Sequence, residues 1–122
     1  MAQLQSVFDA IVFSRVHYTA PAWRGSLSAG EMARLQQLFT NAKQRNIVAS
    51  NYDIDVLLEN CDLTLFGSSL YITHCLHHLL PDKRDHTHAM TLRARGHNYS
   101  LPRYTFLNAR NSFINRSLYK YV

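Results

Sequence analysis

The sequence predicts an all-α fold, a small helical bundle followed by an irregular basic extension. Two observations carry this prediction. Through residues 4–79, apolar residues recur at intervals of three and four, the spacing that places them on one face of a helix. Alternation of polar and apolar residues, which is typical of strands, is confined to a short stretch after Pro81. With 122 residues, of which 47% are hydrophobic and 17% charged, the chain is long enough for a modest core. We expect the bundle over residues 1–81 and the extension over residues 82–122.

The first helix is predicted over residues 4–18. Its apolar stripe consists of Leu4, Val7, Phe8, Ile11, Val12 and Val16. Pro21 is expected to end it, since proline has no amide hydrogen to donate and its ring clashes with the preceding turn. Trp23, the single tryptophan, follows this proline and is expected to anchor a corner between two helices to the core.

A second helix has a clear start signal at Ser28. Ser28 and Glu31 form an S-x-x-E capping box, in which each side chain bonds to the other residue's backbone amide. Leu27 and Met32 flank the box as a hydrophobic staple. The apolar stripe then continues through Met32, Leu35, Leu38, Phe39 and Ala42.

Two further helices are predicted before Pro81. Asp53 is placed to cap a third helix through Cys61, and Asp62 a fourth helix that runs to about Leu79. Gly67 lies inside the fourth and weakens it. Beyond Pro81, residues 89–95 and 99–103 could pair as a β-hairpin, and residues 110–121 have the spacing of a short terminal helix.

Several classes of function leave no signature here. No stretch reaches the roughly 18 uninterrupted apolar residues of a membrane-spanning helix. The four glycines are scattered, which argues against a phosphate-binding loop, and no serine lies in a G-x-S-x-G motif. The one close pair of carboxylates, Asp53 and Asp55, suits helix capping better than a metal site. We expect no catalytic residue, no cofactor, no small-molecule substrate and no membrane partner.

The cysteines and the N-terminal segment bear on location. Cys61 and Cys75 are too few for a disulfide framework, which favours a reducing compartment. Asp9 stands in the first residues without an early lysine or arginine, unlike a secretory signal. The expected location is intracellular, nuclear or cytoplasmic.

Seven histidines raise the question of a zinc site. His74 and His78 would share one face of the fourth helix, and Cys75, His77, His86 and His88 lie near them in sequence. Because no second pair of ligands is defined, we predict no metal and expect His74 to be a packed, hydrogen-bonded side chain.

The strongest functional signal is a charge asymmetry. Residues 1–85 contain all eight acidic residues against seven basic ones, whereas residues 86–122 contain six basic residues and no acidic one. Tyrosines and phenylalanines alternate with these cations, so the segment offers charges for phosphates and rings for bases. The predicted nucleic-acid-binding residues are Arg93, Arg95, Tyr99, Arg103, Tyr104, Arg110 and Arg116. A basic tail that is merely solvated, with its rings packed on the helices, is the alternative.

Several segments, in order, carry a resemblance to a known family. They are Tyr18-Thr19-Ala20-Pro21-Ala22-Trp23, Arg34-Leu35-Gln36, Thr64-Leu65-Phe66, His74-Cys75-Leu76-His77-His78-Leu79-Leu80-Pro81-Asp82-Lys83-Arg84, Leu92-Arg93-Ala94-Arg95-Gly96-His97 with Leu101-Pro102, and Arg110-Asn111-Ser112-Phe113-Ile114-Asn115-Arg116-Ser117-Leu118-Tyr119. In this order they resemble the C-terminal end of the reverse transcriptase of LINE-like, non-LTR retrotransposons. The Y-x-x-P-A-W and L-L-P-x-K-R segments are the most specific of them.

The resemblance implies a thumb-like helical bundle followed by a terminal extension, which in that family lie after the catalytic palm. The palm aspartates of an RNA-directed DNA polymerase have no counterpart here, since the order of Tyr52-Asp53-Ile54-Asp55 is different. The chain is therefore interpreted as a non-catalytic C-terminal fragment of a transposable element, with sequence-independent binding to RNA or DNA through its basic third. Two alternatives stay open: a degenerate fragment without a selected function, and a protein-interaction module that docks Phe113, Ile114 and Leu118 on a partner.

Overall fold

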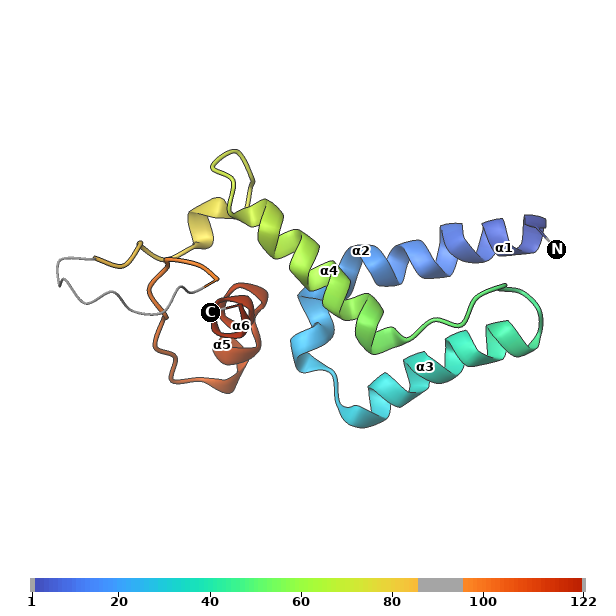
Figure 1. Cartoon of the computed structure of the whole chain (residues 1–122). Helices are drawn as coiled ribbons and strands as arrows, with labels where there is room; N and C mark the ends of the chain where they lie inside the picture. Colours follow the sequence, from blue (N-terminus) through green and yellow to red (C-terminus); the bar gives the residue numbers. More distant parts are fainter. Residues whose placement is uncertain (1, 86–95, 122) are drawn as a thin grey trace. The chain divides into compact units, whose positions relative to one another are not determined.

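The computed structural model describes residues 2–85 and 96–121, and these residues are mostly helical (Figure 1). The predicted all-α class is confirmed: no strand occurs in the described ranges, where Lys83 and Tyr99 form an isolated β-bridge. The chain divides into two compact units, Met1–Thr64 and Leu65–Val122, called here the N-terminal and C-terminal units. The expected division at residue 81 differs from this one, because Leu80 and Phe66 pack with residues of the C-terminal segment.

The N-terminal unit begins with a continuous helical rod. It consists of α1 (Ala2–Phe8), a π-helical segment (Asp9–Phe13) and α2 (Ser14–Trp23), which are drawn in blue in Figure 1. The prediction that Pro21 ends this helix is wrong, since α2 continues to Trp23. Thr19 explains how the turn holds: its hydroxyl donates to the Arg15 carbonyl at 2.7 Å and accepts the Trp23 indole N–H at 2.9 Å. These side-chain bonds span the turn in which proline lacks an amide hydrogen.

Helix α3 (Ala29–Gln44) begins and ends as local chemistry dictates. The predicted capping box is confirmed: Ser28 Oγ accepts the Glu31 N–H at 3.3 Å, and the Glu31 carboxylate accepts the Ser28 N–H at 2.8 Å. The Ser28 hydroxyl also donates to the Glu31 carboxylate, at 3.1 Å. The bond from the Ser28 N–H and then this hydroxyl bond hold the pKa of the Glu31 carboxyl below its usual value. At the other end, Asn46 adopts a left-handed φ of 56°, and the Ile47 and Asn46 amides close a Schellman motif on the Ala42 and Lys43 carbonyls.

Helix α4 (Ile54–Ser69) is a single helix where two were predicted. Asp53 does cap it, because its carboxylate accepts the Asp55 N–H at 3.0 Å. Asp62 does not begin a second helix. It lies in the middle of α4, with its side chain 3% exposed, and forms an ion pair with Arg24 at 3.0 Å. The charge of Arg24, 38 positions earlier in the chain, gives Asp62 a partner inside the fold.

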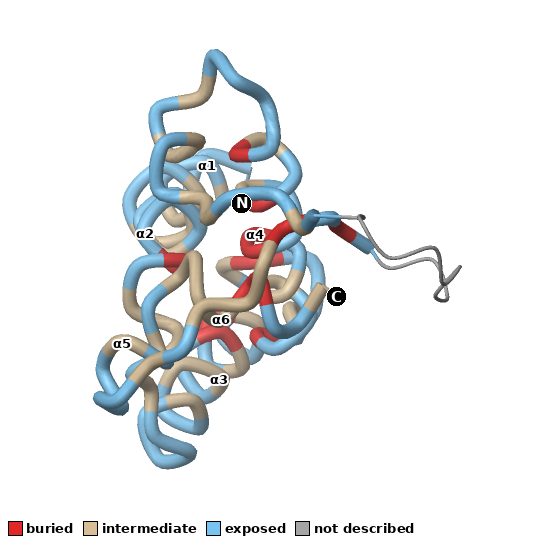
Figure 2. The backbone as a smooth tube through the Cα atoms, turned by 90° about the vertical axis from the view of Figure 1, so that its left-hand side faces the viewer, coloured by how far each residue is buried: buried red, intermediate tan, exposed pale blue. Residues whose placement is uncertain are grey.

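The core of the N-terminal unit is built where α1 to α4 face one another. Ala20, Phe39, Ile54, Leu58 and Cys61 form its buried centre, and the buried positions of the chain are the red segments in Figure 2. The Phe39 ring of this centre contacts the rings of Phe8 and Tyr52, with centroids 5.7 and 5.6 Å apart. Phe13 in turn contacts Tyr52 at 5.2 Å. The Gln36 amide joins α3 to the start of α4, donating to the Tyr52 carbonyl at 2.9 Å and accepting the Ile54 N–H at 3.0 Å.

The C-terminal unit begins with the last turn of α4 and a series of turns. The predicted fourth helix to Leu79 is wrong, because α4 ends at Ser69 and only His77–Leu79 resumes a short 3₁₀ turn. His77 Nδ1 donates to the Ser69 carbonyl at 3.0 Å and so satisfies an acceptor at the end of α4.

The two cysteines are both free thiols: Cys75 is exposed and Cys61 is buried. Burial raises the pKa of the Cys61 thiol.

The predicted hairpin takes a different form in the described residues. Its first arm, 89–95, lies outside them, and Tyr99 of the second arm is paired with Lys83. The Arg84 amide donates to the Asn98 carbonyl at 2.8 Å and the Ser100 amide to the Asp82 carbonyl at 3.0 Å. This short antiparallel contact holds residues 98–100 against residues 82–84.

Helices α5 (Leu107–Asn111) and α6 (Phe113–Lys120) complete the C-terminal unit. The terminal helix predicted over 110–121 is therefore present as α6, with a break at Ser112. Three hydrogen bonds to the Ala109 carbonyl fix this corner: the Ser112 amide at 3.3 Å, the Ser112 hydroxyl at 2.8 Å and the Asn115 side-chain amide at 2.8 Å. Phe66, Tyr99 and Leu118 form the buried centre of the unit, with Phe113 and Ile114 packed against it.

Gly67 in α4 offers a direct test of local helix energetics. It is exposed, and a Cβ built at this position meets nothing within 4 Å. We expect Gly67→Ala to raise the free energy of unfolding by about 0.5–1 kcal/mol, because alanine loses less backbone entropy in a helix. Urea titration followed by far-UV circular dichroism measures this change, and a destabilised variant would contradict an exposed helical position for Gly67.

No helix within residues 2–85 or 96–121 is long and apolar enough to cross a membrane.

Candidate nucleic-acid interface

The C-terminal unit contains a hollow of about 390 Å³ with a basic and aromatic lining. The residues that line it are Tyr104, Arg110, Asn111, Arg116, Tyr119 and Lys120. Three of these side chains are cations, two are tyrosines and one is an amide. The three predicted residues Tyr104, Arg110 and Arg116 thus lie around one concavity.

Helix α6 supplies half of this lining. Arg116, Tyr119 and Lys120 are spaced by three and four residues, so they share one side of the helix. The Arg116 guanidinium lies over the Phe113 ring, 5.8 Å from its centroid. The Lys120 amino group lies over the Tyr121 ring at 5.8 Å. Contacts of this kind favour defined positions for the cations.

The two tyrosines of the hollow support each other. The Tyr119 hydroxyl donates to the Pro102 carbonyl at 2.6 Å, which orients its ring. The Tyr104 ring packs edge-on against it, with centroids 5.6 Å apart. The segment 102–104 is thereby held against α6, and Arg110 reaches the same hollow from α5.

The sign of the local charge is uniform. The sequence contains no acidic residue after Asp85. With histidine counted as neutral, every charged side chain of residues 96–121 is therefore positive. Within the described ranges, Arg103 and Arg110 make no ion pair. A hollow whose described lining has three cations and no acidic side chain suits phosphate groups, which accept hydrogen bonds from guanidinium and ammonium groups.

The remaining predicted residues lie elsewhere. Arg93 and Arg95 lie outside the described residues. Arg103 is exposed, next to Tyr104. Tyr99 is buried at 9% exposure and its ring contacts His97 in the core of the C-terminal unit, so this ring does not present a face for stacking on a base.

Sequence reasoning missed three lining residues: Asn111, Tyr119 and Lys120. A signal for two of them was present. Once residues 110–121 are predicted as a helix, the spacing of Tyr119 and Lys120 from Arg116 places all three on one side. Asn111 gives no comparable signal, because its position depends on the break at Ser112.

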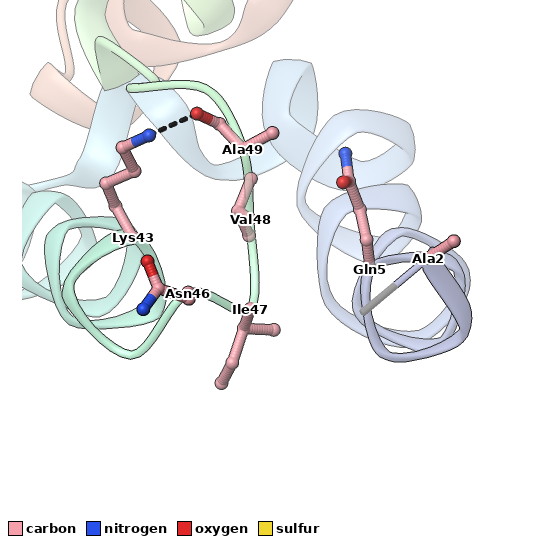
Figure 3. Close-up of a pocket in the computed structure, with 7 residues that line it drawn as sticks. All are labelled: Ala2, Gln5, Lys43, Asn46, Ile47, Val48 and Ala49. Carbon is pink, nitrogen blue, oxygen red and sulfur yellow. Dashed lines mark hydrogen bonds between the residues drawn. The ribbon is translucent and has the colours of Figure 1, made fainter.

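A second hollow lies in the N-terminal unit and is shown in Figure 3. Its lining comes from α1, from the last turn of α3 and from the segment that follows α3: Ala2, Gln5, Lys43, Asn46, Ile47, Val48 and Ala49. The one charged group there, the Lys43 amine, already donates a hydrogen bond to the Ala49 carbonyl (Figure 3). This arrangement offers less to an anionic ligand than the hollow of the C-terminal unit.

The histidine-rich segment has structural roles in the described residues. His74 and His78 do not share a helical face, because residues 70–76 form turns. His74 Nδ1 accepts the Leu76 N–H at 3.2 Å, and His77 is bonded to Ser69. No group of three or more potential metal ligands comes together among the described residues.

The apolar face that could have docked on a partner is occupied inside the fold. Leu118 is fully buried, and Phe113 and Ile114 pack against the same core cluster. Helix α6 therefore turns this face toward its own unit and leaves its basic residues at the hollow.

No protein-family model, curated protein or solved structure matches this chain.

Proposed function

We propose that the C-terminal unit binds the phosphate backbone of RNA or DNA through the basic hollow, without sequence specificity. The observation that carries this proposal is the convergence of Arg110, Arg116 and Lys120 on one concavity in a segment without acidic residues. Phosphate contacts position a nucleic acid but read no sequence, because they are the same at every nucleotide. The proposal assigns no catalytic step to this chain.

We further propose that the chain corresponds to the C-terminal region of a non-LTR retrotransposon reverse transcriptase. The proposal rests on the resemblance, and packing within the C-terminal unit agrees with it, since separate segments of the resemblance meet there. Phe66 contacts His97 with ring centroids 5.9 Å apart, and Tyr119 bonds to Pro102. Segments that depend on one another for packing would be retained together.

A salt titration tests the binding function. A fluorescein-labelled 20-nucleotide single strand is titrated with the chain at several salt concentrations between 50 and 200 mM, and anisotropy gives the dissociation constant. If three cations each displace a counterion, a plot of the logarithm of the association constant against the logarithm of the salt concentration should have a slope of about −2. Arg110→Gln should make the slope shallower by about 0.7 and weaken binding several-fold.

Arg15→Gln is the matched control for this variant. Arg15 is an exposed arginine on α2 of the N-terminal unit, outside the lining of the hollow. We expect it to leave both affinity and slope unchanged. Affinity that is independent of salt, or equal losses for Arg15→Gln and Arg110→Gln, would contradict the proposal.

A further inference from the structure

We infer that the basic hollow takes a single-stranded segment of RNA or DNA and that Phe106 stacks on one of its unpaired bases. This inference rests on the proposed function and names the form of nucleic acid that the same site would hold. Its starting point is an exposed aromatic side chain that no packing role within the described residues explains.

Phe106 is 75% exposed and immediately precedes α5. The Arg110 amide donates to the Phe106 carbonyl at 3.2 Å, so the phenylalanine lies one helical turn before a cation of the hollow. Arg103 is also exposed and stands three residues earlier. An apolar ring with arginines on both sides in sequence is typical of surfaces that bind bases and phosphates together.

A stacking phenylalanine selects single strands for a geometric reason. In a duplex the faces of the bases are covered by neighbouring base pairs, and only their edges and the backbone are accessible. A protein ring can cover a base only after that base is unstacked, which costs less in a single strand than in a duplex, because no base pair has to open. Because phenylalanine has no hydrogen-bonding group, the contact should tolerate any base.

The same exposed pair, Phe106 and the 67% exposed Leu107, would also suit an apolar protein contact. The charges around it favour nucleic acid. Arg103, Arg110, Arg116 and Lys120 give this part of the unit a single sign, and a phosphate chain matches that sign along its whole length. A protein partner would need a matching acidic surface in addition to an apolar one.

The experiment compares three labelled probes of one sequence, a 12-nucleotide DNA single strand, the same RNA and the DNA duplex, at 100 mM salt. Phe106→Ala should weaken binding of both single strands about tenfold, the loss expected for one base stack, while duplex binding changes less than twofold. Phe106→Trp should retain single-strand affinity, and its new indole fluorescence should be quenched when the single strand binds. Because Phe106 is exposed, both variants are expected to keep the circular dichroism spectrum of the parent chain.

Tyr71→Ala provides the matched control. Tyr71 is a 71% exposed aromatic residue of the same unit. Unlike Phe106 it has no cation near it in sequence, since no lysine or arginine occurs between residues 46 and 82. It should leave all three affinities unchanged. Equal loss of single-strand and duplex binding in Phe106→Ala, or unchanged single-strand binding, would overturn the inference while leaving the backbone proposal intact. Absence of binding to every probe by the parent chain would overturn both.

Discussion

Replacing Arg24 with methionine is expected to lower the free energy of unfolding of the N-terminal unit by about 3 kcal/mol or more. Arg24 contacts Asp62 at 3.0 Å and Glu59 at 3.2 Å from a side chain that is itself 19% exposed. The variant leaves the Asp62 carboxylate, 3% exposed, without this countercharge in the fold. A buried charge that loses a close countercharge retains its desolvation cost, and this cost is what makes the loss large.

Two companion variants separate this explanation from a general loss of packing. Glu59→Gln removes the negative charge of the 37% exposed partner of the same arginine and should cost less than about 1 kcal/mol, since water screens that pair. Arg24→Met combined with Asp62→Leu should recover most of the stability, because no charge is then buried. Trp23 is the only tryptophan and lies beside Arg24, so its fluorescence during urea unfolding reports on this unit. If the double variant is no more stable than Arg24→Met, uncompensated charge is not the cause.

The same residues show how far local sequence patterns reach. Asp53 and Asp62 both precede apolar helical stripes, and both were predicted as N-caps. The prediction holds for Asp53, whose carboxylate bonds to an amide two residues on. It is wrong for Asp62, whose role is decided by Arg24 far away in the chain. The capping box of Ser28 and Glu31 was predictable because all its atoms lie within one turn.

Pro21 illustrates the opposite error, in which a reliable local rule was overridden. The sequence rule ends a helix before proline, but here a threonine hydroxyl and a tryptophan indole hold the turn, and Ala20 beside the proline is fully buried. The two hydrogen bonds are local, each between residues four apart, whereas the burial of Ala20 is a tertiary effect that leaves no periodic signal.

The candidate site was predictable in its chemistry and only partly in its geometry. The absence of acidic residues after Asp85 pointed to the segment, and Arg110, Arg116 and Tyr104 do share one hollow. Burial of Tyr99 could not be foreseen, since it depends on Phe66, Leu118 and the bridge to Lys83. Phe106 was visible in sequence as one ring among several, and its exposure singles it out.

His97→Ala is expected to disrupt the C-terminal unit and, with it, nucleic-acid binding, although no cation is removed. His97 is 6% exposed and joins two parts of the unit. Its Nδ1 accepts the Tyr99 N–H at 3.2 Å, so the ring proton resides on Nε2, which donates to the Leu118 carbonyl at 2.7 Å. The variant leaves both backbone groups without these bonds and removes the ring that packs against Phe66. Each unsatisfied buried group costs about 1–3 kcal/mol, so we expect a total loss of about 3 kcal/mol or more.

The consequence for the site follows from the position of Leu118 in α6. The same helix carries Arg116, Tyr119 and Lys120, which line the basic hollow. Amide hydrogen exchange of Phe113–Lys120 should accelerate strongly in His97→Ala, and single-strand affinity should fall at least as far as in Arg110→Gln. His78→Ala, an exposed histidine of the same unit, should change neither measurement.

Conservative variants of His97 distinguish the hydrogen bonds from the volume of the ring. Asparagine retains an acceptor near the position of Nδ1, and glutamine a donor near that of Nε2, so each can keep one of the two bonds. We expect protection of α6 to rank parent chain, then glutamine, then asparagine, then alanine, because the bond to Leu118 is the one that holds the helix directly. One outcome would contradict this account: the glutamine variant protects α6 no better than alanine, and both variants still bind nucleic acid. Binding would then not require a docked α6, and the site would have to lie at arginines outside this helix.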